Sequence, residues 1–303
     1  MKINFLIIII FCFVLTGYSQ QDEKHYKKGN ARANKEDFLG AIEEFNKAIE
    51  IIPNNFYAYV RRGAAKSKLK DYPGAMEDFN KAIEMSPDYA EAYIQRGISK
   101  RLKGDYQSAL EDLNKALEIT PNNSRTYYSK AITLDKLQDN EGAIEAYTNS
   151  ISLSSGNSNA YFGRGSSKYK LKDYKGAVED FTKAIELNPK DGEAYNNRGN
   201  AKLKLDDMNG SIEDYSMAIK INPNAATAFY NRGISKFKLQ KYDDALEDFN
   251  KSIEINPNEA SIYYYRGVIK IALNQKEEGC LDLKKSAALG YTKAEEGILK
   301  FCN

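Results

Sequence analysis

Histidine and cysteine are scarce in this chain, and both scarcities limit the chemistry that it can perform. Among 303 residues there is one histidine, His25, and there are three cysteines. A nucleophilic serine or cysteine needs a neighbouring base, so any Ser–His or Cys–His system would depend on that single histidine. No Cys-x-x-Cys or His-Glu-x-x-His motif is present, and the glycines form no phosphate-binding loop. The sequence predicts a non-enzymatic protein with no cofactor and no metal site.

Net charge is also nearly absent. Forty-four Lys and Arg residues stand against 42 Asp and Glu residues, which gives a formal net charge of +2. A general nucleic-acid binder needs an excess of basic side chains on one face, so we expect no nucleic-acid partner. The 28% of charged and 42% of hydrophobic residues are typical of a helix-rich globular chain.

Hydrophobic runs are short everywhere except near the amino terminus. There, Lys2 precedes an apolar run from Ile3 to Leu15, and Gly17-Tyr18-Ser19 follows with small residues at the two positions that a signal peptidase reads. This three-part pattern indicates that residues 1–19 form a secretory signal peptide, cleaved after Ser19. We therefore expect an exported mature chain, either periplasmic or secreted.

Two alternatives to a cleaved signal peptide are a membrane anchor and a lipoprotein signal. The apolar run is shorter than the ~20 residues that span a bilayer. Cys12 lies inside that run, and the bulky Phe11 precedes it where a lipoprotein signal carries a small residue. Both observations favour soluble export, with no membrane span after cleavage.

Internal repetition dominates the rest of the sequence. With Asp22 as position 1, a 34-residue ruler fits eight copies without an insertion. Position 8 is glycine in seven copies, positions 20 and 27 are small, position 24 is always large, and position 32 is proline in six copies. The copies are residues 22–55, 56–89, 90–123, 124–157, 158–191, 192–225, 226–259 and 260–291.

This pattern predicts two packed helices in each copy. Small residues at positions 8, 20 and 27 let two helices approach closely, and the large side chain at position 24 fills the space beside them. Proline at position 32 ends the second helix. Helices of ~13 residues are marginal alone, so each copy depends on its neighbours and the chain folds as one array, residues 20–303.

The pattern aromatic-x3-Gly … Tyr-x2-Ala-x3-Phe-x2-Ala-x4-Pro resembles the tetratricopeptide repeat family over residues 22–291. One departure is position 4, which holds His25 and otherwise tyrosine or phenylalanine where the family usually has tryptophan. The resemblance implies an all-α, right-handed superhelical solenoid of tandem helix–turn–helix repeats. We expect residues 292–302 to form an amphipathic capping helix after the eighth repeat.

Charged residues recur at positions 7, 11 and 23. Position 7 is basic in every copy, and position 23 is acidic in every copy except the fourth, where Lys130 and Ala146 replace the arginine and the acid together. This joint loss predicts an ion pair between the two helices of each repeat rather than an arginine ladder for anionic ligands. Lysine at position 11 is expected to cover neighbouring helices with its methylenes and keep its charge in water.

The fourth repeat and the carboxyl terminus carry two further predictions. Ser154 to Ser158 replace the proline turn of the fourth repeat, so we expect a softer joint between repeats 1–4 and 5–8. Cys280 and Cys302 lie at similar distances before and after the turn at Gly290. In an oxidising compartment they are expected to form a disulfide, the alternative being two buried thiols.

The family resemblance also implies that the first helix of each repeat lines a concave groove. Asparagine amides there can donate to and accept from a peptide backbone, and tyrosines supply rigid contact area. The candidate partner-binding residues are Tyr128, Phe162, Asn196, Asn197, Asn200, Tyr230, Asn231, Tyr264 and Tyr265. Alternatively, these side chains merely solvate the helices. The two-carboxylate clamp of some family members is broken, because Asn196, Ser261 and Tyr265 replace its cations.

These observations predict a protein–protein interaction scaffold of the bacterial cell envelope or secreted space, which holds a partner peptide or domain. The alternative is a non-catalytic glycan-binding protein that uses the Tyr- and Asn-rich groove of repeats 5–8.

Overall fold

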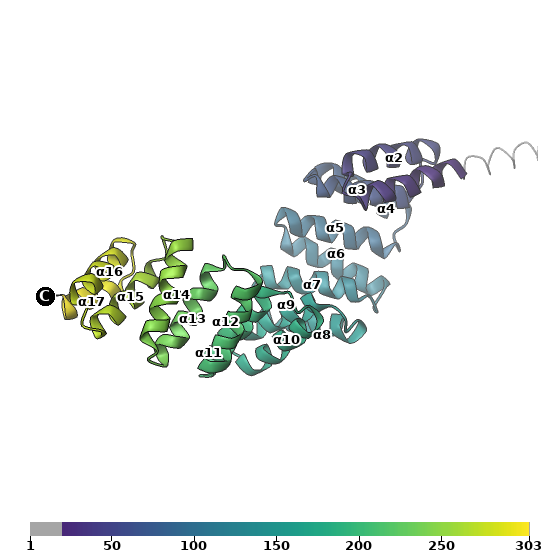
Figure 1. Ribbon diagram of the computed structural model, residues 1–303. Coiled ribbons are helices and arrows are strands. Elements are labelled where there is room, and N and C mark those ends of the chain that lie inside the picture. Colours follow the sequence, from purple (N-terminus) through teal and green to yellow (C-terminus); the bar gives the residue numbers. More distant parts are fainter. Residues whose placement is uncertain (1–19, 303) are drawn as a thin grey trace, which may run out of the picture. The chain divides into compact units, whose positions relative to one another are not determined.

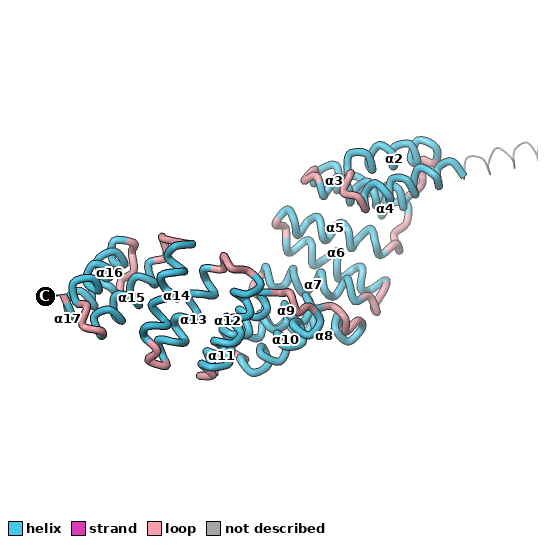
Figure 2. Tube along the Cα trace, in the orientation of Figure 1, coloured by secondary structure: helices cyan, strands magenta, loops and turns pink. Residues whose placement is uncertain are grey.

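The computed structural model describes residues 20–302, and its secondary structure within that range is helical throughout, without a strand (Figure 2). Residues 20–33 are helical and are followed by sixteen further helices, α2 to α17. The predicted signal peptide, residues 1–19, lies outside the described residues. The all-α class and the helix–turn–helix repeats that the sequence predicts are confirmed.

Each repeat consists of a first helix, a tight turn and a second helix. Residues 20–33 supply the first helix of repeat 1. The first helices of the later repeats are α3 (Phe56–Lys68), α5 (Ala90–Lys103), α7 (Ser124–Lys136), α9 (Ser158–Lys170), α11 (Gly192–Lys204), α13 (Ala226–Lys238) and α15 (Ala260–Ala272). The second helices are α2 (Phe38–Ile51), α4 (Tyr72–Met85), α6 (Tyr106–Ile119), α8 (Asn140–Leu153), α10 (Tyr174–Leu187), α12 (Met208–Ile221), α14 (Tyr242–Ile255) and α16 (Lys276–Ala288).

The chain divides into two compact units between Ser155 and Gly156. In the first unit, helices α2 to α8 stack so that each packs against the next along the chain (Figure 1). In the second unit, α9 to α16 stack in the same way. The division falls at the turn where the sequence predicts a softer joint, and the softness of that joint stays a prediction.

The turn inside each repeat uses a left-handed residue followed by a capping residue. Position 15 has a positive φ in every repeat, and only Gly104 is a glycine, with φ of 95°. The others have φ between 58° and 65°; they are Glu36, Lys70, Gln138, Lys172, Asp206, Gln240 and Asn274. In the first six repeats, aspartate at position 16 then caps the second helix, as where Asp37 accepts a hydrogen bond from the Gly40 amide; Lys241 and Gln275 at this position make no side-chain cap. This turn reverses the chain without a loop.

Small residues and rings interlock inside each repeat, as the sequence predicts. Phe79 is fully buried against Gly63, where an added Cβ would lie 2.9 Å from its Cε1 atom. Gly233 meets Phe249 in the same way, at 2.7 Å. These contacts leave no room for a side chain, which explains why position 8 is glycine.

A buried ion triad joins the two helices in repeats 2, 3 and 5–8. In repeat 6, Arg198 donates from Nε and Nη2 to the two carboxylate oxygens of Asp214, at 2.9 and 2.6 Å. The predicted ion pair is confirmed. Lys202, at position 11, lies 2.9 Å from the same carboxylate. The expectation that position 11 keeps its charge in water is wrong, because a buried carboxylate with two accepting oxygens can bind two cations.

The first repeat contains a variant of this triad. Glu44 is buried and accepts a 2.9 Å hydrogen bond from Lys28, and its other oxygen lies 2.7 Å from Nδ1 of His25. His25 stands at position 4, where the other repeats have an aromatic ring, and it is also a polar partner of Glu44. The short imidazole reaches a carboxylate one methylene longer than the aspartate of other repeats.

The eighth repeat is covered by α17 (Lys293–Phe301), which packs against α15 and α16. Cys280 of α16 and Cys302, directly after α17, form a disulfide with Cα atoms 5.7 Å apart. This bond ties the end of the described chain to the last repeat.

Candidate binding surface

The predicted binding residues lie on first helices but belong to two units. Tyr128 is on α7 of the first unit, and the other eight are on α9, α11, α13 and α15 of the second. All nine side chains are partly exposed. Eight of the predicted residues therefore belong to one unit, the second, whereas Tyr128 belongs to the first.

An asparagine cluster forms the centre of the second unit's site. The side-chain amide of Asn231 on α13 donates to Oδ1 of Asn200 at 3.0 Å and to Oδ1 of Asn196 at 3.5 Å, both on α11. The Tyr215 hydroxyl also donates to Oδ1 of Asn200, at 2.8 Å. Asn196 in turn donates to Asn197 at 3.4 Å. These bonds fix the orientation of the amides before any partner binds.

The cluster retains unused hydrogen-bonding groups. Within the described residues, Nδ2 of Asn200, Nδ2 of Asn197 and Oδ1 of Asn231 make no hydrogen bond. Two donor groups and one acceptor of the cluster are thus unused, and an extended backbone offers the complementary acceptors and donors.

Two hollows adjoin this cluster and share Asn197. One, of about 150 Å³, is lined by Asn200, Ser166 and the rings of Tyr169 and Phe181. The other, of about 390 Å³, is lined by Asn196 together with small and apolar side chains of α12 and α13. A polar ridge between two partly apolar hollows suits a peptide whose side chains enter the hollows while its backbone meets the amides.

The remaining aromatic residues contribute mainly to packing. Phe162 packs on the buried Phe181, with ring centroids 5.6 Å apart. Tyr265 contacts Tyr230 and Phe249, each at 6.2 Å, and burial raises its pKa to about 12. Tyr264 lies 5.2 Å from Tyr291, beside the capping helix. Each of these rings is therefore in contact with at least one neighbouring ring.

Sequence reasoning missed a cationic groove in the first unit. A hollow of about 240 Å³ is lined by Arg61, Lys68 and Arg125, and none of its described lining residues is acidic. Arg125 pairs with Glu91 nearby, at 3.2 Å. All three cations occupy positions 2, 6 or 13 of their repeats. These positions lie on the first helices, which the family resemblance assigns to the groove, so the basic residues there could have been recognised in the sequence.

Arg101 on α5 adds to the positive charge of this unit. Its Nε is buried and has no hydrogen-bond partner among the described residues. Burial lowers the pKa of Arg101. The groups that act on this pKa in the opposite direction are the hydroxyls of Tyr128, Tyr147 and Tyr106, with no carboxylate among them. Tyr128 itself packs against Tyr147 at 6.0 Å. A partly buried guanidinium with a buried, unpartnered Nε is costly, and an anionic ligand would offset part of that cost.

Neither a metal-binding cluster nor a membrane-spanning helix is present among the residues that the structure describes. Among residues 20–302, no three His, Cys, Asp or Glu side chains cluster as a metal site requires. Across that same range, no helix has the length and hydrophobicity needed to cross a bilayer.

Sequence comparison identifies the family. The model described as tetratricopeptide repeat matches residues 56–89, 90–123, 158–191, 192–225 and 226–259, which together exceed half of the chain. Two other models with the same description match residues 25–55 and 113–145. The chain belongs to the tetratricopeptide repeat family, whose fold serves as a scaffold for protein–protein interaction. No curated protein sequence is similar enough to count as a match.

Several solved structures share the fold. MamA is 26% identical with a TM-score of 0.54, over 57% of this chain and 94% of MamA. YrrB, described as a TPR protein with an unusual peptide-binding site, is 24% identical with a TM-score of 0.54, over 61% of this chain and 95% of YrrB. The pilF protein of Pseudomonas aeruginosa is 19% identical with a TM-score of 0.59, over 69% of this chain and 97% of pilF. The latter two likenesses concern the fold alone.

Proposed function

We propose that the second unit binds an extended segment of a partner protein across α9, α11 and α13. The observation that carries this proposal is the asparagine cluster, in which hydrogen bonds join side chains of α11 and α13 and leave donors of Asn197 and Asn200 and the acceptor of Asn231 unused. Preorganised amides lower the entropy lost on binding. The peptide-binding site in the description of YrrB, which has the same fold, supports the proposal by analogy.

Peptide selection on the mature protein tests this proposal. Peptides enriched from a random library would be titrated against wild type, Asn200→Ala and the control Asn209→Ala. Asn209 is exposed on α12 and lines neither hollow. We expect Asn200→Ala to weaken binding by about three- to tenfold, the loss of one hydrogen bond. Equal affinity for both variants would contradict the proposed site.

The first unit offers a groove of different chemistry. Arg61, Lys68 and Arg125 line this hollow without an acidic residue among its described lining, so we infer that the segment bound there is acidic. Binding of a glutamate-rich peptide should weaken as salt rises and should fall in Lys68→Ala. Salt-independent binding of a neutral peptide would contradict an electrostatic role.

Glycan binding is the competing function. Sugar rings stack on free aromatic faces, but Tyr230, Tyr264 and Tyr265 contact one another or neighbouring rings. This packing favours a peptide over a glycan. A glycan array tested beside the peptide library decides between the two functions. Binding of a sugar without binding of any peptide would favour the glycan function.

We further propose that the protein acts outside the cytoplasm, in the periplasm or after secretion. The pattern of residues 1–19 and the proximity of Cys280 to Cys302 both support this proposal. Mass spectrometry of the protein from its native cells should find a chain that begins at Gln20. A chain that retains Met1 through Ser19 would contradict export by cleavage.

A further inference from the structure

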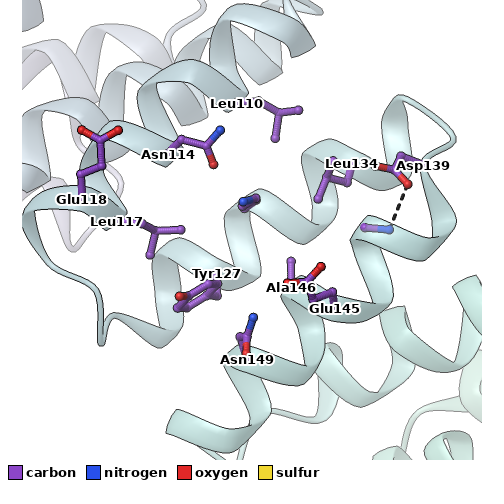
Figure 3. Close-up of a pocket in the computed structure, with 12 residues that line it drawn as sticks. Leu110, Asn114, Leu117, Glu118, Tyr127, Leu134, Asp139, Glu145, Ala146 and Asn149 are labelled. Carbon is purple, nitrogen blue, oxygen red and sulfur yellow. Dashed lines mark hydrogen bonds between the residues drawn. The ribbon is translucent and has the colours of Figure 1, made fainter.

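The fourth repeat lacks the ion triad, and a pocket occupies the corresponding place. Lys130, Leu134 and Ala146 stand at positions 7, 11 and 23, where the other triads have arginine, lysine and aspartate. All three line a pocket of about 670 Å³ between α6, α7 and α8, here called the fourth-repeat pocket. Figure 3 shows Asn114 on α6 and Asn149 on α8 beside it. This volume suits a ligand or several side chains of a partner.

The groups that surround the arginine in other repeats are still present. In repeat 2, Arg62 lies 5.1 Å from the ring centre of Tyr59 and donates to Asn46 of the preceding repeat at 2.7 Å. The equivalents in repeat 4 are Tyr127 and Asn114, and both line the pocket. The fourth repeat has therefore lost the buried carboxylate but kept its surroundings.

Lys130 lacks a direct ion-pair partner, although acidic residues line the same pocket. It makes no ion pair with any residue of the described chain, whereas the basic residue at position 7 is paired in the neighbouring repeats, as Arg96 is with Asp112. The amide groups of Asn114 and Asn149 supply further N–H donors around the position of Ala146. One ammonium and two amides form a donor set for a carboxylate.

Three carboxylates also line the pocket and contribute to its electrostatic potential. Asp139 caps α8 by accepting from the Gly142 amide at 2.9 Å, and Glu118 is paired with Lys115 at 2.9 Å. Glu145 is the remaining lining acid. The charge of Glu145 is opposite to that of Lys130 and should repel an anionic ligand. Removing the charge of Glu145 therefore tests whether the ligand is an anion.

We propose that the fourth-repeat pocket is a second docking site, which accepts an acidic side chain of a partner protein flanked by apolar residues. Its carboxylate occupies the place of the absent position-23 aspartate and pairs with Lys130, while Leu110, Leu117 and Leu134 contact the apolar neighbours. This site lies apart from the asparagine cluster and does not depend on the function proposed for that cluster.

The probe for this site is the peptide acetyl-Leu-Glu-Leu-amide, titrated against ¹⁵N-labelled mature protein by NMR. Peptides with Gln or Arg in place of Glu serve as the neutral and the positively charged controls. We expect saturable shifts at Asn114, Lys130 and Asn149 with the Glu peptide, and an affinity about fivefold or more lower with the Gln peptide. Stronger binding of the Arg peptide, or no saturable shift, would overturn the proposal.

Variants separate the proposed role from a merely structural one. Lys130→Met should abolish the preference for Glu, whereas Lys136→Met, on the same helix but outside the pocket, should leave it unchanged. Glu145→Gln should tighten binding of the Glu peptide severalfold, because it removes a repelling charge. Ala146→Asp supplies an internal carboxylate, so it should block binding and raise the melting temperature. Unchanged binding in Ala146→Asp would also overturn the proposal.

Discussion

Arg198 of α11 binds Asp214 of α12 through two parallel hydrogen bonds, from Nε to Oδ2 at 2.9 Å and from Nη2 to Oδ1 at 2.6 Å. The aspartate side chain is 3% exposed, and Lys202 reaches its Oδ2 at 2.9 Å. One buried carboxylate therefore pairs with two cations from the first helix of the repeat. The ion triad fixes the rotation of each first helix and hence which side chains face a partner.

Removing that carboxylate should destabilise the second unit strongly. Asp214→Ala leaves Arg198 and Lys202 without an anion, and breaking a buried pair from one side typically costs about 3–5 kcal/mol. Urea unfolding of the mature protein measures the change.

The fourth repeat provides the matched control. A variant that combines Arg198→Lys, Lys202→Leu and Asp214→Ala reproduces its residues at positions 7, 11 and 23. It should lose less stability than Asp214→Ala alone, because a single lysine can reach water. If the triple variant is the less stable of the two, the electrostatic account of the triad is wrong.

Gly233, at position 8 of the seventh repeat, should not tolerate a methyl group. Gly233→Ala places a Cβ 2.7 Å from Cε1 of Phe249, a ring that is fully buried and cannot move aside. Such overpacking costs about 1–3 kcal/mol. Gly156→Ala is the control, because no atom lies within 4 Å of the added Cβ. Similar unfolding free energies for the two variants would disprove the steric argument.

The disulfide should stabilise the carboxyl-terminal cap. Cys280 and Cys302 close a loop with a sequence separation of 22, which contributes about 3 kcal/mol on the chain-entropy estimate. Hydrogen exchange should show faster opening of α17 in Cys280→Ser/Cys302→Ser than in wild type. Adding a reductant should reproduce this effect in wild type and change nothing in the variant. Free thiols in freshly purified native protein would contradict the bond.

Acid should loosen the first repeat. Hydrogen bonds from Lys28 and then His25 lower the pKa of Glu44 from its usual 4.5 to about 2. A lowered folded-state pKa adds stability above the unfolded value, and that stability is lost as the pH falls from 4.5 toward 2. Hydrogen exchange of α2 should therefore rise in this range. Glu44→Gln should lack this part of the pH dependence; if it keeps the full dependence, another group is responsible.

The sequence predicts the helices and the interlocking glycines and rings because one steric pattern recurs in eight copies. The Arg–Asp pairing is also predictable, because Lys130 and Ala146 change together. Position 11 was misjudged, since a periodic lysine looks the same whether it lies in solvent or beside a buried acid. The left-handed conformation of position 15 is hard to predict from the sequence, because Gly104 is the only glycine at that position.

The candidate site is only partly readable from sequence. Asn196, Asn200 and Asn231 are brought together because position 6 of one repeat lies beside positions 5 and 9 of the preceding one. The packing of Tyr264 against Tyr291 is not readable, because it depends on how the last turn and the capping helix fold back.

Photo-crosslinking from position 200 tests the central claim most directly, namely that the first-helix surface of the second unit holds a partner polypeptide. A photoreactive phenylalanine analogue would replace Asn200 in native cells, with Lys251, exposed on α14, as the comparison position. The account predicts a protein adduct of defined mass from position 200 and none from position 251. No adduct from position 200, or the same adducts from both positions, would contradict it.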